Sequence, residues 1–284
     1  VRADLIQAGF DCTDSGKWVP ILKTGSGAYT NATYSDNGDT SITNPVWIDA
    51  NLDDAPDVSP SDPVCFITGA VPKIVNAKLN VFPDLGAGSM AVSVKVEATP
   101  IGAAGSPPSL VFGPTNVTLT GASVGVPTVT TTGTVGSVVN SFSYSMDWKL
   151  SANGGATWST FQTMTQQVFV VLDTPRTNYC SNHKPTAHAW DLPYTWEPLS
   201  WTAKRMAWAT EKGKGGDVPT DVALLFRNAL NFDPGFTNAA NYSNSFVQLD
   251  KPTAQERKGD CITLANLAAT ALRLIGLEGC PARA

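Results

Sequence analysis

Charge, basic residues and long apolar runs are all scarce in this sequence. Only 15% of its 284 residues are charged, against about 25% in an average soluble protein. The net charge of -5 argues against a general nucleic-acid binder, because such proteins are basic. No apolar run approaches the roughly 20 residues that cross a bilayer. The sequence also lacks a C-x-x-C pair, so a structural zinc site is not expected.

What the sequence does contain is an apolar fraction of 42%, together with 24 glycines and 20 prolines. The length suits roughly two domains, and the apolar fraction is enough for a sizeable core. Many turn residues with few charges are typical of an extracellular β protein. The sequence begins at Val1 without an initiator methionine or a signal-like segment, which predicts a processed or excised chain.

Five cysteines, an odd number, are spread along the chain. In a secreted protein four of them can pair, and one is left over. Cys12 and Cys65 flank the early loop region, and Cys180 and Cys280 flank the later half, so either pair could be a disulfide. Four cysteines allow three connectivities, and the sequence does not choose among them. Cys261 is the natural leftover thiol.

The first 175 residues carry short alternating apolar segments, separated by Gly, Pro, Asp and Asn. The period of two predicts half-buried strands at about ten-residue spacing, as in an antiparallel, Ig-like β-sandwich. The expected strands are 66–68, 78–82, 91–96, 111–112, 116–119, 128–132, 141–150 and 167–172.

An acidic segment over residues 35–63 precedes these strands. It is interpreted as a solvated loop. Asp36 and Asp39 could supply some of the six to eight oxygens that calcium requires. The run around them is not a complete EF-hand loop, so the plain acidic loop is the favoured interpretation, and no other cofactor is expected.

Prolines and aromatic residues mark the segment that follows the strands. Four prolines, Pro175 and three more within the segment, and few periodic apolar positions predict an irregular linker over residues 176–199. The aromatic residues in and after it could stack on sugars or peptides, although docking onto a neighbouring domain is the favoured interpretation. These aromatic residues are Trp190, Tyr194, Trp196, Trp201 and Trp208.

After residue 199 the pattern becomes helical. Residues 201–210 and 219–231 are expected to form amphipathic helices. A third helix is predicted from Asp260, a good N-cap, to Gly276, a good C′ residue. This helix is apolar nearly all round, which is typical of a helix buried at the centre of a domain.

Cys261 stands in the first turn of the third helix, after Gly259 and Asp260. Unpaired backbone N–H groups and the positive end of the helix dipole stabilise a thiolate there, and so lower the pKa of the thiol. The same N–H groups can bind an oxyanion, and Gly259 leaves room for a substrate backbone. These features predict a nucleophilic thiol. The alternative is a small buried hydrophobic residue, which is a common role of cysteine.

Three parts of the sequence resemble a known family: the segment 257–265, the helix end Leu272-Arg273-Leu274-Ile275-Gly276-Leu277, and Pro281-Ala282-Arg283 beyond it. Together they resemble the core of transglutaminase-like domains, which have a papain-like fold. The resemblance implies that Cys261 descends from a catalytic cysteine and that the two preceding helices are the family's helical lead-in. Gly279 and Cys280 are an insertion relative to the family phrase.

The resemblance also implies a catalytic His and Asp on strands that follow the Cys helix. The sequence ends at Ala284, before such strands. We therefore expect a truncated domain that is inactive alone and leaves Leu264 and Leu274 to be covered by a second polypeptide. His188 would be the base only in a permuted fold, and a solvated linker histidine is the favoured interpretation.

Residues 151–158 resemble an Asp-box hairpin, Ser-x-Asp-x-Gly-x-Thr-Trp, with Asn153 in place of the Asp. Asn-Gly and Gly-Gly supply the positive φ values of a tight turn, and Trp158 is expected to pack back on the hairpin. Asp-boxes are structural and repeated in sialidase propellers. One copy therefore predicts a hairpin and not a sialidase.

Together these features predict an α+β multidomain protein. Residues 1–175 are expected to form the β-sandwich, 176–199 the linker, and 200–284 a mainly helical, truncated transglutaminase-like domain. The expected function is extracellular thiol acyl transfer, or peptide hydrolysis, on a protein or peptide substrate. The alternative is a non-catalytic extracellular adhesion or assembly protein with a vestigial Cys helix.

Overall fold

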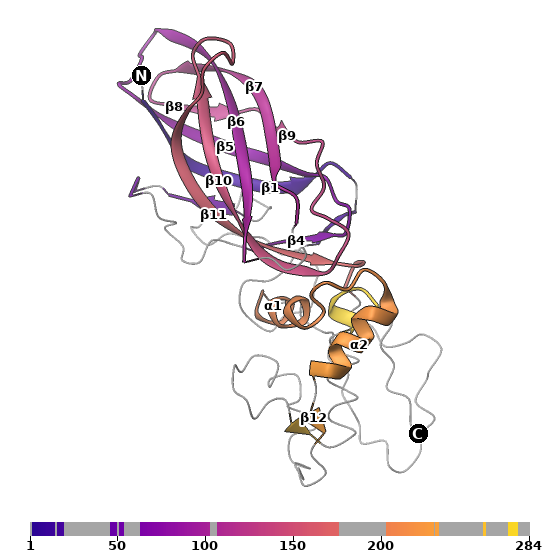
Figure 1. Ribbon diagram of the computed structural model, residues 1–284. Coiled ribbons are helices and arrows are strands. Elements are labelled where there is room, and N and C mark those ends of the chain that lie inside the picture. Colours follow the sequence, from indigo (N-terminus) through magenta and orange to yellow (C-terminus); the bar gives the residue numbers. More distant parts are fainter. Residues whose placement is uncertain are drawn as a thin grey trace.

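The computed structural model shows a mostly β protein with a small helical part at one end of its sheets (Figure 1). The predicted fold class was therefore wrong, because the described residues after the sandwich do not form a mainly helical domain. The structure describes residues 2–14, 16–19, 46–49, 51–53, 63–102, 107–175, 203–229, 231–232, 258–259 and 272–277.

The strands form two large sheets and one short parallel pair. Their bounds are β1 (Arg2–Cys12), β2 (Trp18–Val19), β3 (Val46–Ile48), β4 (Val64–Ile67), β5 (Pro72–Phe82), β6 (Ser89–Ile101), β7 (Leu110–Thr120), β8 (Ser123–Val126), β9 (Val129–Thr130), β10 (Asn140–Ser151), β11 (Ser159–Val171), β12 (Asn231–Phe232) and β13 (Lys258–Gly259). The helices are α1 (Ala203–Lys212), α2 (Pro219–Ala229) and a short helical end at residues 272–274.

The first sheet has the order β3-β1-β5-β8, with β9 also paired to β5. The second has the order β2-β4-β11-β10-β6-β7. Its strands pair antiparallel except for β4 and β11, which run parallel with Val168 opposite Val64. The second sheet is therefore mixed, whereas a purely antiparallel sandwich was expected. A parallel pair needs a long crossover, and here the strands of the pair are separated by most of the sandwich.

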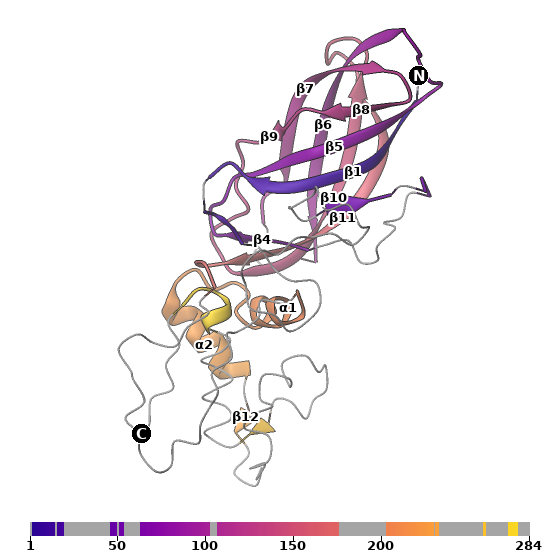
Figure 2. The same ribbon diagram turned by 180° about the vertical axis from the view of Figure 1, so that it is seen from behind.

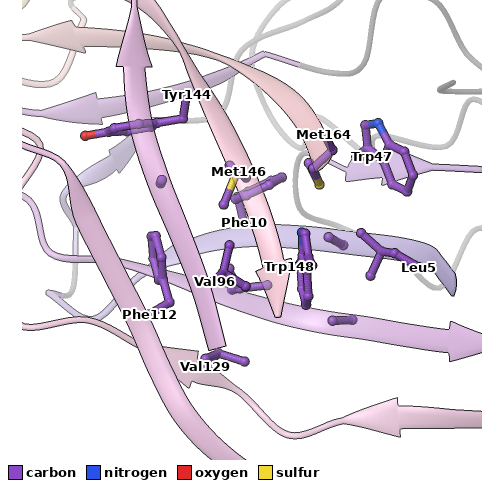
Figure 3. Packing of buried hydrophobic residues seen from close by; sticks show 14 of the residues in the cluster. Leu5, Phe10, Trp47, Val96, Phe112, Val129, Tyr144, Met146, Trp148 and Met164 are labelled. Atoms are coloured by element: carbon purple, nitrogen blue, oxygen red, sulfur yellow. The ribbon is translucent and has the colours of Figure 1, made fainter. Parts of the chain in front are cut away.

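The two sheets pack face to face around one large core (Figures 1 and 3). Leu5 from β1 and Trp148 from β10 are both fully buried in it, and Phe112 reaches it from β7. One buried polar contact joins the sheets: the Leu5 backbone N–H donates to Gln162 Oε1 at 2.6 Å. Leu5 stands in β1, whose pairing with β5 shifts register on either side of Gln7.

The helices cover the opposite, outer face of the second sheet at one end of the molecule (Figure 2). Along the end of β11, Val168 and Val170 point into the main core, whereas Phe169 and Val171 belong to a second cluster. That cluster also contains Met206 and Ala209 of α1, Val222 of α2, and Leu274 and Ile275. A short amphipathic helix needs a surface on which to bury its apolar stripe, and here the sheet supplies it.

Backbone hydrogen bonds fix the helical part to the sheet. The loop between α1 and α2 pairs with the residue before β10: Val139 N–H donates to Gly216 O at 2.8 Å, and Gly215 N–H donates to Val139 O at 2.9 Å. Lys214 Nζ donates to Gly102 O, after β6, at 3.1 Å. None of the helices in the described ranges has the length and apolarity needed to cross a membrane.

Most of the strands expected from alternation lie within observed ones. The ranges 111–112 and 116–119 form one continuous strand, β7, and 167–172 is the end of the much longer β11. The helices expected at 201–210 and 219–231 are confirmed as α1 and α2. Strands β1, β2, β3 and β8 were not expected.

Candidate functional site

The site predicted around Cys261 is described only at its margins. Gly259 lies on β13. Asp260 and Cys261 themselves lie outside the described residues, as do His188, Cys180, Cys280, Asp36 and Asp39. The structure therefore describes the two residues just before the predicted Cys helix and the residues at its predicted end, and not the reactive atom.

The approach to the helix start is a short parallel pairing. β13 lies beside β12, with Asn231 opposite Lys258 and Phe232 opposite Gly259. The chain that leaves α2 thus pairs with the chain that leads to Cys261. Alternation cannot find strands of two residues, so sequence reasoning missed this contact.

The helical end at residues 272–274 finishes in a Schellman motif, with Gly276 at the predicted C′ position. Gly276 has a φ of +92°. Its N–H donates to Arg273 O at 3.1 Å, and Leu277 N–H donates to Leu272 O at 2.9 Å. These are the two hydrogen bonds that define this helix end. The prediction of Gly276 as the C′ residue is confirmed.

The same helix end is held against the two residues that follow β11. Ile275 O accepts hydrogen bonds from the N–H groups of Leu172, at 3.1 Å, and Asp173, at 3.2 Å. A Cβ on Gly276 would lie 2.2 Å from Asp173 O, far inside ordinary contact. Glycine is therefore required here both by its backbone conformation and by the space available.

The apolar face at this helix end is covered by the chain itself. Leu274 and Ile275 are fully buried, and their cluster contains Cys65, Phe169 and Val171. The expectation that Leu274 would need a second polypeptide was wrong. The reason is that the outer face of the sheet already covers it. Leu264 lies outside the described residues.

Cys12 and Cys65, both of which the structure describes, are free buried thiols and not a disulfide with each other. Cys12 belongs to the main core and Cys65 to the second cluster. Burial raises the pKa of the Cys65 thiol far above its ordinary value. Burial also raises the pKa of Cys12, although hydrogen bonds from the N–H groups of Asp14 and Val71 oppose the increase. Neither thiol is suited to act as a nucleophile at neutral pH.

The Asp-box-like segment is a structural hairpin between β10 and β11, as predicted. Asn153 Oδ1 accepts from Ser151 Oγ at 2.8 Å and from Thr157 N–H at 3.0 Å. Gly155 N–H donates to Ser151 Oγ at 2.9 Å, and Gly154 and Gly155 both have positive φ. Asn153 can stand in the place of the aspartate because its Oδ1 also supplies an acceptor for Ser151 Oγ–H and Thr157 N–H.

Trp158 packs back on this hairpin. Its ring lies against Gly155, and Lys95 Nζ lies 4.7 Å from the ring centroid. Lys95 also pairs with Glu97 at 2.7 Å, and Lys149 pairs with the same carboxylate. The hydrogen bonds from Lys149 and then Lys95 lower the pKa of Glu97. The cluster is satisfied within itself, and it gives the hairpin a structural role.

No group of three or more His, Cys, Asp or Glu side chains converges on a metal-sized site within the described ranges. Asp49 and Asp53, within the expected acidic loop, form a local turn in which Asp53 N–H donates to Asp49 Oδ1 at 3.1 Å. The calcium expectation at Asp36 and Asp39 remains a prediction.

Comparison with protein-family models, with curated proteins and with solved structures finds no match. The resemblance to transglutaminase-like domains therefore stays a hypothesis that rests on the residues quoted for it.

Proposed function

We propose that Cys261 is the nucleophile of a thiol acyl transfer, in the manner of transglutaminase-like enzymes, on a protein or peptide substrate outside the cell. One structural observation supports the proposal most. Lys258 and Gly259, just before the predicted Cys helix, pair with β12, and Ile275, at its predicted end, is hydrogen-bonded to the two residues that follow β11. A nucleophile must be held in a fixed geometry to react efficiently.

The chemistry follows from the position of Cys261 in a first helical turn. The thiolate attacks a carboxamide or peptide carbonyl carbon, and a C–S bond forms while the carbonyl oxygen becomes an oxyanion. Backbone N–H groups of the first turn stabilise that oxyanion. The C–N bond then breaks, and the nitrogen leaves as an amine once it has gained a proton. Water or a second amine resolves the thioester.

The proton for the leaving amine is the task of a general acid, which the resemblance assigns to a histidine. An activated ester tests the nucleophile without that group, because p-nitrophenolate leaves without needing a proton. The substrate of choice is therefore a blocked peptide p-nitrophenyl ester. The C–S bond forms, the C–O bond breaks, and the coloured anion is released in one step.

The test combines this acylation with alkylation by iodoacetamide across pH, resolved for each cysteine by peptide mass spectrometry. We expect one p-nitrophenolate per chain, a thioester on Cys261, and an apparent pKa for Cys261 below the free value of about 8.5. Cys12 and Cys65 are internal controls that should remain unmodified, because both are buried. Cys261→Ala should abolish the burst.

A Cys261 that reacts only after denaturation would refute the proposal. It would support the second function, a non-catalytic extracellular adhesion or assembly protein. One feature of the described part of the chain favours that alternative. Side chains of the sheet and of the helices pack into one hydrophobic cluster, as is expected of a rigid structural module.

A further inference from the structure

Two buried side chains on neighbouring strands carry hydrogen-bond donors that lack an acceptor among the described residues. Trp148 of β10 and Gln162 of β11 stand directly opposite each other in the antiparallel pairing, and their exposed fractions are 0% and 5%. Within the described part of the chain, Trp148 Nε1 and Gln162 Nε2 have no hydrogen-bond partner. A buried donor that stays unpaired costs free energy, so this pair of donors requires an acceptor.

The orientation of the Gln162 amide is fixed by the opposite sheet. Gln162 Oε1 accepts a hydrogen bond from the Leu5 backbone N–H at 2.6 Å. If the amide were turned over, Nε2 would face that N–H and two donors would oppose each other. Nε2 therefore remains a donor in the part of the core that also contains Trp148 and Leu5 (Figure 3).

The two donors belong to side chains on the same face of the sheet. Trp148 is part of the main core cluster. Gln162 stands two residues before Met164, another member of that cluster, and residues two apart on a strand share a face. Residues directly opposite each other in an antiparallel pair have Cβ atoms about 4.5–5.5 Å apart. One small acceptor between the indole and the amide can therefore serve both donors.

A β-bulge at the same place supplies a backbone group for the site. The pairing passes from Trp148 opposite Gln162 to Lys149 opposite Thr160, so Phe161 has no partner residue in β10. The extra residue of a bulge leaves its backbone outside the regular ladder of hydrogen bonds. The Phe161 carbonyl is thus an acceptor one residue away from Gln162.

We propose that a water molecule is bound here, where it accepts hydrogen bonds from Trp148 Nε1–H and Gln162 Nε2–H and donates one to the Phe161 carbonyl. Buried waters make about three hydrogen bonds to polar groups that lack other partners, and these three groups meet that requirement. An anion is ruled out as the acceptor because a charge among apolar side chains has a large desolvation cost. The water connects β10 to β11 at the bulge, and Gln162 extends the connection to β1. This site is independent of the chemistry proposed for Cys261.

The water is detected by NMR on the full chain labelled with ¹⁵N-tryptophan. The Trp148 indole N–H is assigned from its NOEs to the ring of Phe161, since the two ring centroids lie 6.5 Å apart. We expect this N–H to show a cross-peak to water with opposite signs in NOE and ROE spectra, as a bound water gives, whereas proton exchange gives the same sign in both. Absence of this cross-peak would overturn the proposal.

A second label tests whether the two side chains share the water, and it needs no substitution. In the chain labelled with ¹⁵N-glutamine, the Gln162 side-chain N–H groups should show the same cross-peak to water. A water cross-peak at Trp148 with none at Gln162 would contradict the shared site.

Gln162→Met then removes the amide while keeping a side chain of similar length. We expect it to abolish the cross-peak between Trp148 and water, because the water is left with too few partners. The matched control is Gln166→Met, on the same strand and also buried, but opposite Tyr144, and it should leave the cross-peak unchanged. A cross-peak that survives in Gln162→Met, or is lost equally in both variants, would refute the part assigned to Gln162.

Discussion

Two adjacent valines on β11 test whether the helices are bound to the sheet. Val170 and Val171 are both 0% exposed, but Val170 faces the main core and Val171 faces the cluster shared with the helices. A strand side chain facing an uncovered sheet surface would be exposed. The burial of Val171 therefore depends on contact with α1, α2 and residues 272–277.

The magnitude follows from the carbon atoms removed. Val→Ala deletes two methyl groups, each worth about 0.8 kcal/mol of transfer free energy, and an unrelaxed cavity adds to this. We expect Val170→Ala and Val171→Ala each to lower the free energy of unfolding by about 2 kcal/mol. Thr165→Ala, at an exposed position of the same strand, should change it by less than about 0.5 kcal/mol.

The assay is urea unfolding followed by tryptophan fluorescence, with the slope on denaturant compared among the variants. A Val171→Ala variant as stable as the unaltered chain, beside a Val170→Ala variant that loses about 2 kcal/mol, would refute the shared cluster. The helices would then be a separate unit that does not cover the sheet.

Three further outcomes are expected. Gln162→Leu leaves the buried Leu5 N–H without its acceptor and should lower the free energy of unfolding, measured with urea, by about 1–3 kcal/mol. The control Gln167→Leu, at a half-buried position, should lower it by less than about 1 kcal/mol. Asn153→Ala removes the acceptor of the hairpin turn and should lower stability by about 1 kcal/mol, whereas Asn153→Asp, which keeps the acceptor oxygen, should cost less; equal losses would contradict that role. Burial raises the pKa of Cys65 above its ordinary value of 9.0, so above about pH 9 the unfolded chain loses the thiol proton while the folded chain keeps it. The free energy of unfolding then falls by up to about 1.4 kcal/mol per pH unit. Midpoints of urea unfolding from pH 8 to 10.5 should decline less steeply in Cys65→Ala than in the unaltered chain, and an identical decline would argue against a buried Cys65.

The strands that alternation revealed are those with one face in the core. β6 and β10 alternate buried and less buried residues over most of their length, and the period of two predicted both. β1 escaped prediction because register shifts on either side of Gln7 break its period. It is also buried on both faces for much of its length, and a strand of that kind shows no alternation.

The helices illustrate the limit of local patterns in another way. The stripes of α1 and α2 predicted the helices themselves, because amphipathic periodicity is a local property. It could not show that the stripes would be buried on a sheet. The continuous apolar run Val168-Phe169-Val170-Val171 was the available signal, since a strand end that is apolar on both faces needs a second covering layer.

Gly276 shows how a local rule and a tertiary contact can require the same residue. The rule for helix ends predicts a glycine after the last helical turn because a positive φ is cheap only for glycine. The contact with Asp173 requires glycine for a different reason, since no Cβ fits there. Asparagine, which tolerates positive φ in isolated turns, would satisfy the first requirement and fail the second. Gly276→Asn should therefore lower the free energy of unfolding as much as Gly276→Ala does. At Gly215, which has open space, Asn should lower it less than Ala does. A Gly276→Asn variant as stable as the unaltered chain would mean that the helix end does not pack against Asp173.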